Sequence, residues 1–228
     1  MALFEHAAAR CPRVETLDLC ADVHGDGGDL DFDPGQPEKT RPPTLDLGTA
    51  LRPLYALPQI ENIIVRAPVV MLSEHTLADI AQAWPALEVL SLISTPIVHP
   101  SSSVYCPTLA DLAPLARHCT RLHTLELHVN AIAVPAERTV ARLMGPEASR
   151  CALRCFTAFD APVVNPERVA AFLRRLFPEL REVEYRGAAV FPRDARKVYQ
   201  ANWRQVQDYC RGEAPAVHPL MRSLNALD

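Results

Sequence analysis

Apolar residues along this chain recur in a short phrase that is clearest in residues 84–92. Leu87, Leu90 and Leu92 occupy its fourth, seventh and ninth positions. The last two are separated by one polar residue, which is typical of a strand with one buried face. Immediately upstream, in residues 75–84, apolar side chains return every three or four positions, the spacing of one helix face. The pattern predicts a helix, a proline-marked turn and a short strand.

The same three apolar positions occur in five further segments, each preceded by an apolar helical pattern. The spacing between corresponding positions varies from 27 to 46 residues, and the segments are 11–19, 57–65, 119–127, 150–158 (the weakest) and 177–185. Helix starts are predicted where Asn165 precedes Pro166 and where Thr108 and Asp111 fit a capping box. Six copies of one unit indicate an internal repeat.

Repeated helix–strand units predict an α/β solenoid with irregular repeats. In such an array each unit buries its apolar surface against its neighbours. We expect a parallel sheet on the concave side and helices on the convex side. A doubly wound sheet is the alternative for alternating helices and strands. It is less favoured because nearly every strand carries the same phrase, and because wound sheets usually have more continuously apolar strands.

The domain boundaries follow from where the phrase stops. Residues 1–190 are predicted to form an array of about six units, with an acidic, glycine-rich insertion near 21–44 and a second insertion at 94–106. Residues 191–228 are predicted to form a capping helix and a tail. In that helix, which we place at 192–211, the expected apolar side consists of Val198, Trp203, Val206 and Tyr209.

Composition narrows the functional classes. The formal charge is −4 and the pI is about 6.1, which argues against general nucleic-acid binding, since that requires a basic surface. No run is long and apolar enough to span a bilayer, and the N-terminus has no signal-peptide pattern. Seven scattered cysteines are therefore expected to be reduced thiols. These features predict a cytoplasmic or nuclear protein.

Two stretches carry a family resemblance. They are Ala-x-x-Trp-Pro-x-Leu-Glu-x-Leu-Ser-Leu at 81–92 and Leu-Ala-x-His-Cys-x-Arg-Leu-His-Thr-Leu at 115–125. Both sequence motifs resemble leucine-rich repeats. The irregular spacing is most similar to the repeat region of fungal F-box proteins, and the resemblance covers roughly residues 1–210.

The resemblance implies a protein–protein interaction module that recognises substrates for a Skp–cullin ubiquitin ligase. Its expected partner is a protein or ubiquitylation substrate, with no cofactor, nucleic acid or membrane. No F-box is expected within this chain, because Met1 already falls in the helix of the first unit. A Skp-like adaptor is therefore expected only if an F-box lies upstream. The alternative is a stand-alone leucine-rich-repeat scaffold without ubiquitin function.

An array that begins at an uncapped repeat would leave a strand edge open. We therefore expect the isolated chain to self-associate or to need an upstream segment. Light scattering tests this expectation, and a monodisperse monomer would contradict it.

Side chains between the apolar positions are expected on the concave face, where corresponding residues of the six units form three rows. The first row is Thr16, Asn62, Val89, Thr124, Cys155 and Glu182. The second is Asp18, Ile64, Ser91, Glu126, Thr157 and Glu184. The third is Cys20, Arg66, Ile93, His128, Phe159 and Arg186. The predicted partner-binding residues are Arg66, Val89, Ser91, Ile93, Glu126, His128, Phe159, Glu184 and Arg186. The alternative for each is an ordinary residue of the sheet surface.

No catalytic or metal site is predicted. The aspartates of 22–33 lack the offsets and the closing Glu of a calcium loop. The cysteines and histidines of 118–155 lack finger-like spacing, and Cys119 occupies a turn position that is Trp84 in another unit. No serine or cysteine lies in a recognisable nucleophile motif. We expect the protein not to be an enzyme.

Overall fold

The main sheet has six parallel strands. The computed structural model describes residues 13–20, 44–67, 69–94, 105–145, 149–187 and 193–213. The strands lie side by side in chain order: β1 (Thr16–Cys20), β3 (Asn62–Ala67), β5 (Val89–Ser94), β6 (Thr124–His128), β7 (Cys155–Phe159) and β8 (Glu182–Arg186). Each strand coincides with the end of one copy of the phrase. The predicted α/β class with a parallel sheet is therefore confirmed.

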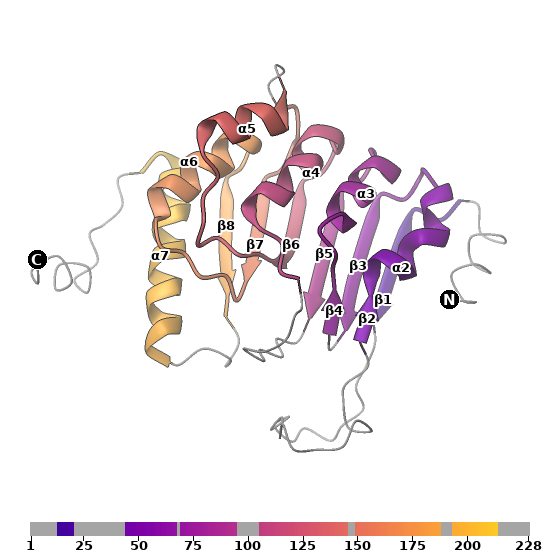
Figure 1. Ribbon diagram of the computed structural model, residues 1–228, viewed down its shortest axis with the longest axis horizontal. Coiled ribbons are helices and arrows are strands. Elements are labelled where there is room, and N and C mark those ends of the chain that lie inside the picture. The colour runs from indigo at the N-terminus through magenta and orange to yellow at the C-terminus, as the bar shows by residue number, and fades with distance from the viewer. Residues whose placement is uncertain are drawn as a thin grey trace, which may run out of the picture.

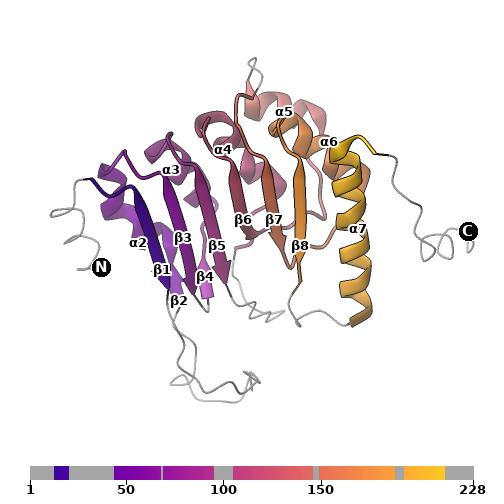
Figure 2. The same ribbon diagram turned by 180° about the vertical axis from the view of Figure 1, so that it is seen from behind.

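The helices gather on one face of this sheet (Figures 1 and 2). They are α2 (Leu47–Leu51), α3 (Thr76–Ala83), α4 (Ala113–His118), α5 (Glu137–Met144) and α6 (Pro166–Leu176), with 3-10 turns at Arg52–Ala56 and Leu109–Leu112. The opposite face, seen in Figure 2, carries no helix from the described residues. We call it the open face. A sequential strand order with helices on a single face differs from a doubly wound sheet, which has helices on both.

The repeated apolar positions form the core between the sheet and the helices. Leu87 and Leu90 are completely buried, and even in the weakest copy Leu153 and Phe156 are at most 1% exposed. On α6 the apolar face is fully packed. The helix starts are also confirmed: Asn165 accepts the backbone N–H of Arg168 at 3.0 Å, and Thr108 and Asp111 form the capping box.

A ladder of backbone hydrogen bonds ties each unit to the next. The fifth residue of each phrase accepts two N–H groups of the following unit through its carbonyl oxygen. The five acceptors are Glu15, Glu61, Glu88, His123 and Arg154. The same position therefore makes the same contact five times along the molecule.

The first position of the phrase adds a second connection between units. The indole Nε1–H of Trp84 donates to the carbonyl of Leu57 at 2.8 Å, and the Cys119 thiol lies 3.7 Å from the carbonyl of Trp84. Trp84 and Cys119 are both completely buried. Both side chains therefore belong to the core.

Helix α7 (Arg193–Arg211) runs beside β8 at the end of the sheet (Figure 1). Trp203 and Val206 are buried as predicted, whereas Val198 is 38% exposed, so its predicted place on the packed side is wrong. No side chain of residues 193–201 is fully buried, and Val198 lies in that part of α7. Its packed side includes Asn202, which donates to the carbonyl of Val163 at 2.7 Å.

Some features lie beyond the sequence predictions. A short parallel pair, β2 (Thr44–Asp46) and β4 (Val69–Met71), was not anticipated and lies on the helical side of the sheet (Figures 1 and 2).

The predicted first helix in residues 1–11 lies outside the described residues. So do residues 21–43 and 95–104, within the two predicted insertions, and most of the tail. No helix in the described parts of the chain is long and apolar enough to cross a membrane.

Candidate functional site: the open face of the sheet

The three predicted rows are present in the strand register. In the first row Thr16 pairs with Asn62, and the pairing continues without a shift to Glu182. The second row runs in the same way from Asp18 to Glu184. The third row pairs from Cys20 to Ile93 and again from His128 to Arg186. All nine predicted partner-binding residues therefore lie on strands of one continuous surface.

At the β1 end of the open face, side chains are accessible. Arg66 is exposed and its guanidinium lies 3.6 Å from the Asp18 carboxylate, with both side chains 51% exposed. Val89 and Ile93 on β5 are half-buried. This end of the face offers a pair of oppositely charged side chains beside apolar ones.

Ser91 in the middle of the face is not accessible. It is only 3% exposed, and its hydroxyl donates to the Glu126 carboxylate at 2.6 Å. A direct partner contact through Ser91, as predicted, does not fit this burial, because a short side chain lies below the longer Glu126. Ser91 instead fixes the position of Glu126, which remains half-buried.

His128 and Phe159 form an aromatic pair farther along the third row. Their ring centroids are 5.5 Å apart with an interplanar angle of 37°. The His128 Nε2–H donates to the carbonyl of Ser94 at 3.1 Å, since a carbonyl can only accept. His128 Nδ1 lies 3.8 Å from an Asp160 carboxylate oxygen. The imidazole is therefore held through Nε2, while Nδ1 faces the Asp160 carboxylate without a hydrogen bond to it.

Burial controls the protonation of His128. Desolvation lowers its pKa below the ordinary value of 6.5, although the Ser94 carbonyl and the Asp160 carboxylate act in the opposite direction. His128 is therefore neutral at pH 7 and enters the surface as an aromatic hydrogen-bonding group.

At the β8 end of the face the charged side chains return. Arg186 and Glu184 form a 3.1 Å ion pair in which both side chains are more than half exposed. Such a pair contributes little to stability because water screens it. Both groups remain available to a partner.

Asp160 belongs to this site but was not identified from the sequence. It directly follows β7, adopts a left-handed φ of 44°, and its side chain is 5% exposed. The signal was a carboxylate at the carboxyl end of a parallel strand, where sites in α/β sheets often form.

The cysteines do not form a reactive or metal-binding centre in the described residues. Cys119 and Cys151 are buried, and burial raises their thiol pKa values to about 12 and about 11. A protonated thiol is a poor nucleophile and a poor ligand. Across the described ranges, no three His, Cys, Asp or Glu side chains gather in a way that would hold a metal ion.

The open face joins charged pairs, half-buried aliphatic groups and an aromatic pair on a continuous sheet surface. The chain matches no known family model and no curated protein sequence.

Proposed function

We propose that the chain is a protein-interaction module that binds its partner on the open face of the sheet. The observation that carries the proposal is that the helices of the described residues cover only one face of a parallel sheet. Parallel sheets normally have both faces covered. Solenoid repeat proteins are an exception, and they use the uncovered side for binding.

We also propose that the fold is a leucine-rich-repeat solenoid. Three features support this: the recurring apolar phrase, the strand order that follows the chain, and the five equivalent carbonyl acceptors from Glu15 to Arg154. Each depends on neighbouring units stacking in a constant way, which is how repeat proteins bury their cores.

The chemistry of the face indicates what the partner presents. Among the eighteen row positions there are four carboxylates and two guanidinium groups, a formal balance of −2. The half-buried apolar side chains Val89, Ile93 and Phe159 lie on the central strands. A complementary partner would place apolar groups at the centre and basic groups around them, as in typical interfaces.

By its resemblance, we propose that this module recognises substrates for an F-box-type ubiquitin ligase in the cytoplasm or nucleus. The test is affinity capture with the protein produced from its complete gene. Recovery of a Skp-like adaptor together with ubiquitylation substrates is expected. Capture of partners without any Skp-like adaptor would reject this role and favour the stand-alone scaffold.

The binding face is tested by a double change, Arg66→Glu with Phe159→Ala. It reverses one charge and removes one aromatic ring from the third row, so we expect partner capture to be lost while the circular dichroism spectrum stays unchanged. The matched control is Arg142→Glu with Leu143→Ala on α5, an exposed cation and a half-buried apolar residue on the helical side. Equal capture by both double variants would place the interface elsewhere.

A further inference from the structure

A pocket lies between the end of β8 and the N-terminal half of α7. It has a volume of about 460 Å³ and is lined by Tyr185, Arg186, Gly187, Arg193, Arg196, Lys197 and Gln200. A second hollow of about 220 Å³ continues along the same seam and shares Tyr185 and Gln200. The pocket lies beside the part of α7 that has no fully buried side chain, whereas Trp203 and Val206 in the later turns are buried.

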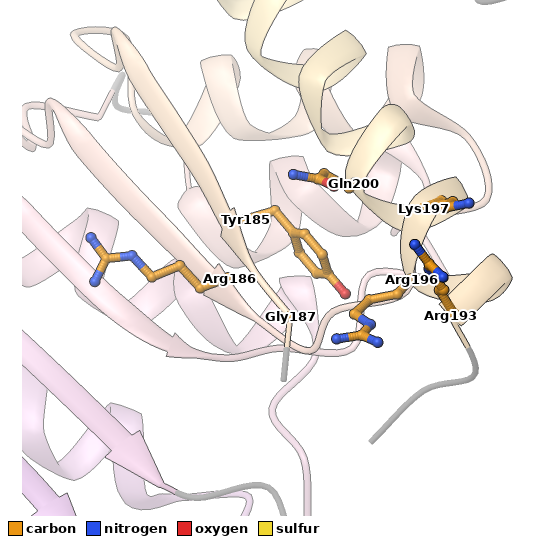
Figure 3. A pocket seen from close by; sticks show the side chains of 7 residues that line it. All are labelled: Tyr185, Arg186, Gly187, Arg193, Arg196, Lys197 and Gln200. Carbon is orange, nitrogen blue, oxygen red and sulfur yellow. The ribbon is translucent and has the colours of Figure 1, made fainter. Parts of the chain in front are cut away.

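The pocket is strongly basic. Three cations, Arg193, Arg196 and Lys197, lie within the first five residues of α7, with Asp194 as the acidic residue of that turn. Arg186 contributes to the wall, but its guanidinium extends away from Tyr185 toward Glu184 (Figure 3). Lys197 lies 4.0 Å from Asp194, whose side chain is 98% exposed, so this contact neutralises little of the charge.

This charge pattern conflicts with the local rules for helix stability. The N-terminus of a helix carries a partial positive charge and favours anions. Like charges three or four residues apart also repel each other. Arg193 with Arg196 and Arg193 with Lys197 have these spacings, so the first turn of α7 is destabilised by its own sequence. Departures from local consistency are typical of functional positions.

The Tyr185 hydroxyl supplies an uncharged group in the same place. Its oxygen is buried and has no hydrogen-bond partner among the described residues. Burial, with a contribution from Asp160, raises the pKa of Tyr185 to about 12, so the hydroxyl keeps its proton at neutral pH and can donate it. Arg196 extends from α7 toward this tyrosine (Figure 3).

Gly187 makes this position of the ring possible. A β-carbon at residue 187 would lie 2.6 Å from the Tyr185 oxygen, closer than atoms can approach. The hydroxyl therefore lies directly against the glycine backbone at the pocket wall.

We propose that this pocket binds a phosphate group, either free or carried on a phosphorylated side chain. Arg193 and Arg196 would supply charge-assisted hydrogen bonds, which suit phosphate oxygens. Tyr185 would donate through its hydroxyl. Arg193 and Arg196 lie on α7, beyond the edge of the sheet, and the pocket shares only Arg186 with the rows of the open face, so the site does not depend on the partner proposed to bind there.

The full chain is titrated calorimetrically with inorganic phosphate and with a short phosphoserine peptide, and its melting temperature is followed with each. Phosphate is expected to raise the melting temperature, and sodium chloride at equal ionic strength is not. Arg193→Gln with Arg196→Gln should weaken binding about a hundredfold, at about tenfold for each charged hydrogen bond. The same variant should melt at a higher temperature without phosphate, because the repulsion in α7 is gone.

The matched control is Arg138→Gln with Arg142→Gln on α5, which removes two exposed cations from another helix. It should bind phosphate like the parent chain, while Tyr185→Phe should bind about tenfold more weakly. Equal affinity for the two ligands would indicate a free phosphate compound, and tighter binding of the peptide would indicate a phosphorylated protein. Absence of binding, an equal effect of chloride, or equal losses in both double variants would overturn the proposal.

Discussion

At the scale of single residues, the fold depends on side chains that connect one unit to the next. Trp84 fills the core, contacts Tyr55 edge-on at a centroid distance of 5.2 Å, and donates to the carbonyl of Leu57. A buried carbonyl without its donor costs free energy, because water cannot replace the lost partner. Trp84 therefore stabilises two units at once.

Replacing Trp84 with Phe should lower the free energy of unfolding by about 2 kcal/mol, from the lost hydrogen bond and the cavity left by the smaller ring. Urea denaturation measures this change. The control is Gln82→Ala at an exposed position of α3, which should stay within about 0.5 kcal/mol of the parent. A Trp84→Phe protein as stable as the control would show that the indole hydrogen bond contributes nothing.

The lowered pKa of His128 predicts how the stability of the protein depends on pH. Its pKa is lowered in the folded protein relative to the ordinary 6.5, so protonation favours the unfolded chain. The contribution of the neutral imidazole to the free energy of unfolding is complete above pH 6.5 and is lost as the pH falls below that value. Denaturation between pH 5 and 8 should show this decline, and His128→Gln should remove part of it. Gln82→Ala, at an exposed position of α3 that carries no titratable group, should not change the profile. If His128→Gln leaves the profile unchanged, the burial effect is absent.

At the scale of elements, α7 protects the last strand of the sheet. The Gln207 side-chain amide accepts the Val183 N–H and donates to the Arg181 carbonyl at 3.0 Å. These backbone groups lie on the side of β8 that faces away from β7. Uncovered strand edges invite pairing with other chains. The Gln207 side chain thus makes the two hydrogen bonds that a neighbouring strand would otherwise make with these backbone groups.

Gln207→Ala should therefore destabilise the protein by about 1 kcal/mol and increase self-association. Gln207→Glu keeps the acceptor for Val183 but loses the donor to Arg181, so we expect about half of the destabilisation. Urea denaturation and light scattering measure the two effects. An Ala variant with the stability and size of the parent would contradict the proposed role of Gln207.

The sequence predicted elements whose causes are local. The strand positions, the three rows and the helix starts at Asn165 and Thr108 follow from apolar periodicity and capping chemistry within a few residues. The helical segment around 51–55 was predicted less well, because Pro53 lacks an N–H group and the segment divides into α2 and a 3-10 turn.

Features that depend on distant segments could not be predicted. The role of Gln207 depends on how α7 approaches β8, and the proximity of Asp160 to His128 depends on the left-handed backbone that follows β7. Burial of Ser91 depends on Glu126, thirty-five residues later. In each case the sequence gives the residue type but not the contact.

At the scale of the whole molecule, the helices, the core and the open face have different roles. Helices on one side bury the repeated apolar positions, and α7 covers the edge at β8. The open face is left with charged, aromatic and aliphatic side chains in register. We propose that a protein partner binds to this face rather than to the helices.

Site-specific photo-crosslinking tests this claim most directly. Benzoylphenylalanine replaces Ile93 on the open face in one variant and Leu143 on α5 in another, and each protein is irradiated with its captured partner. If the partner binds on the open face, we expect a covalent adduct with the partner from position 93 and none from position 143. An adduct from position 143 alone would place the interface on the helical side and contradict binding on the open face.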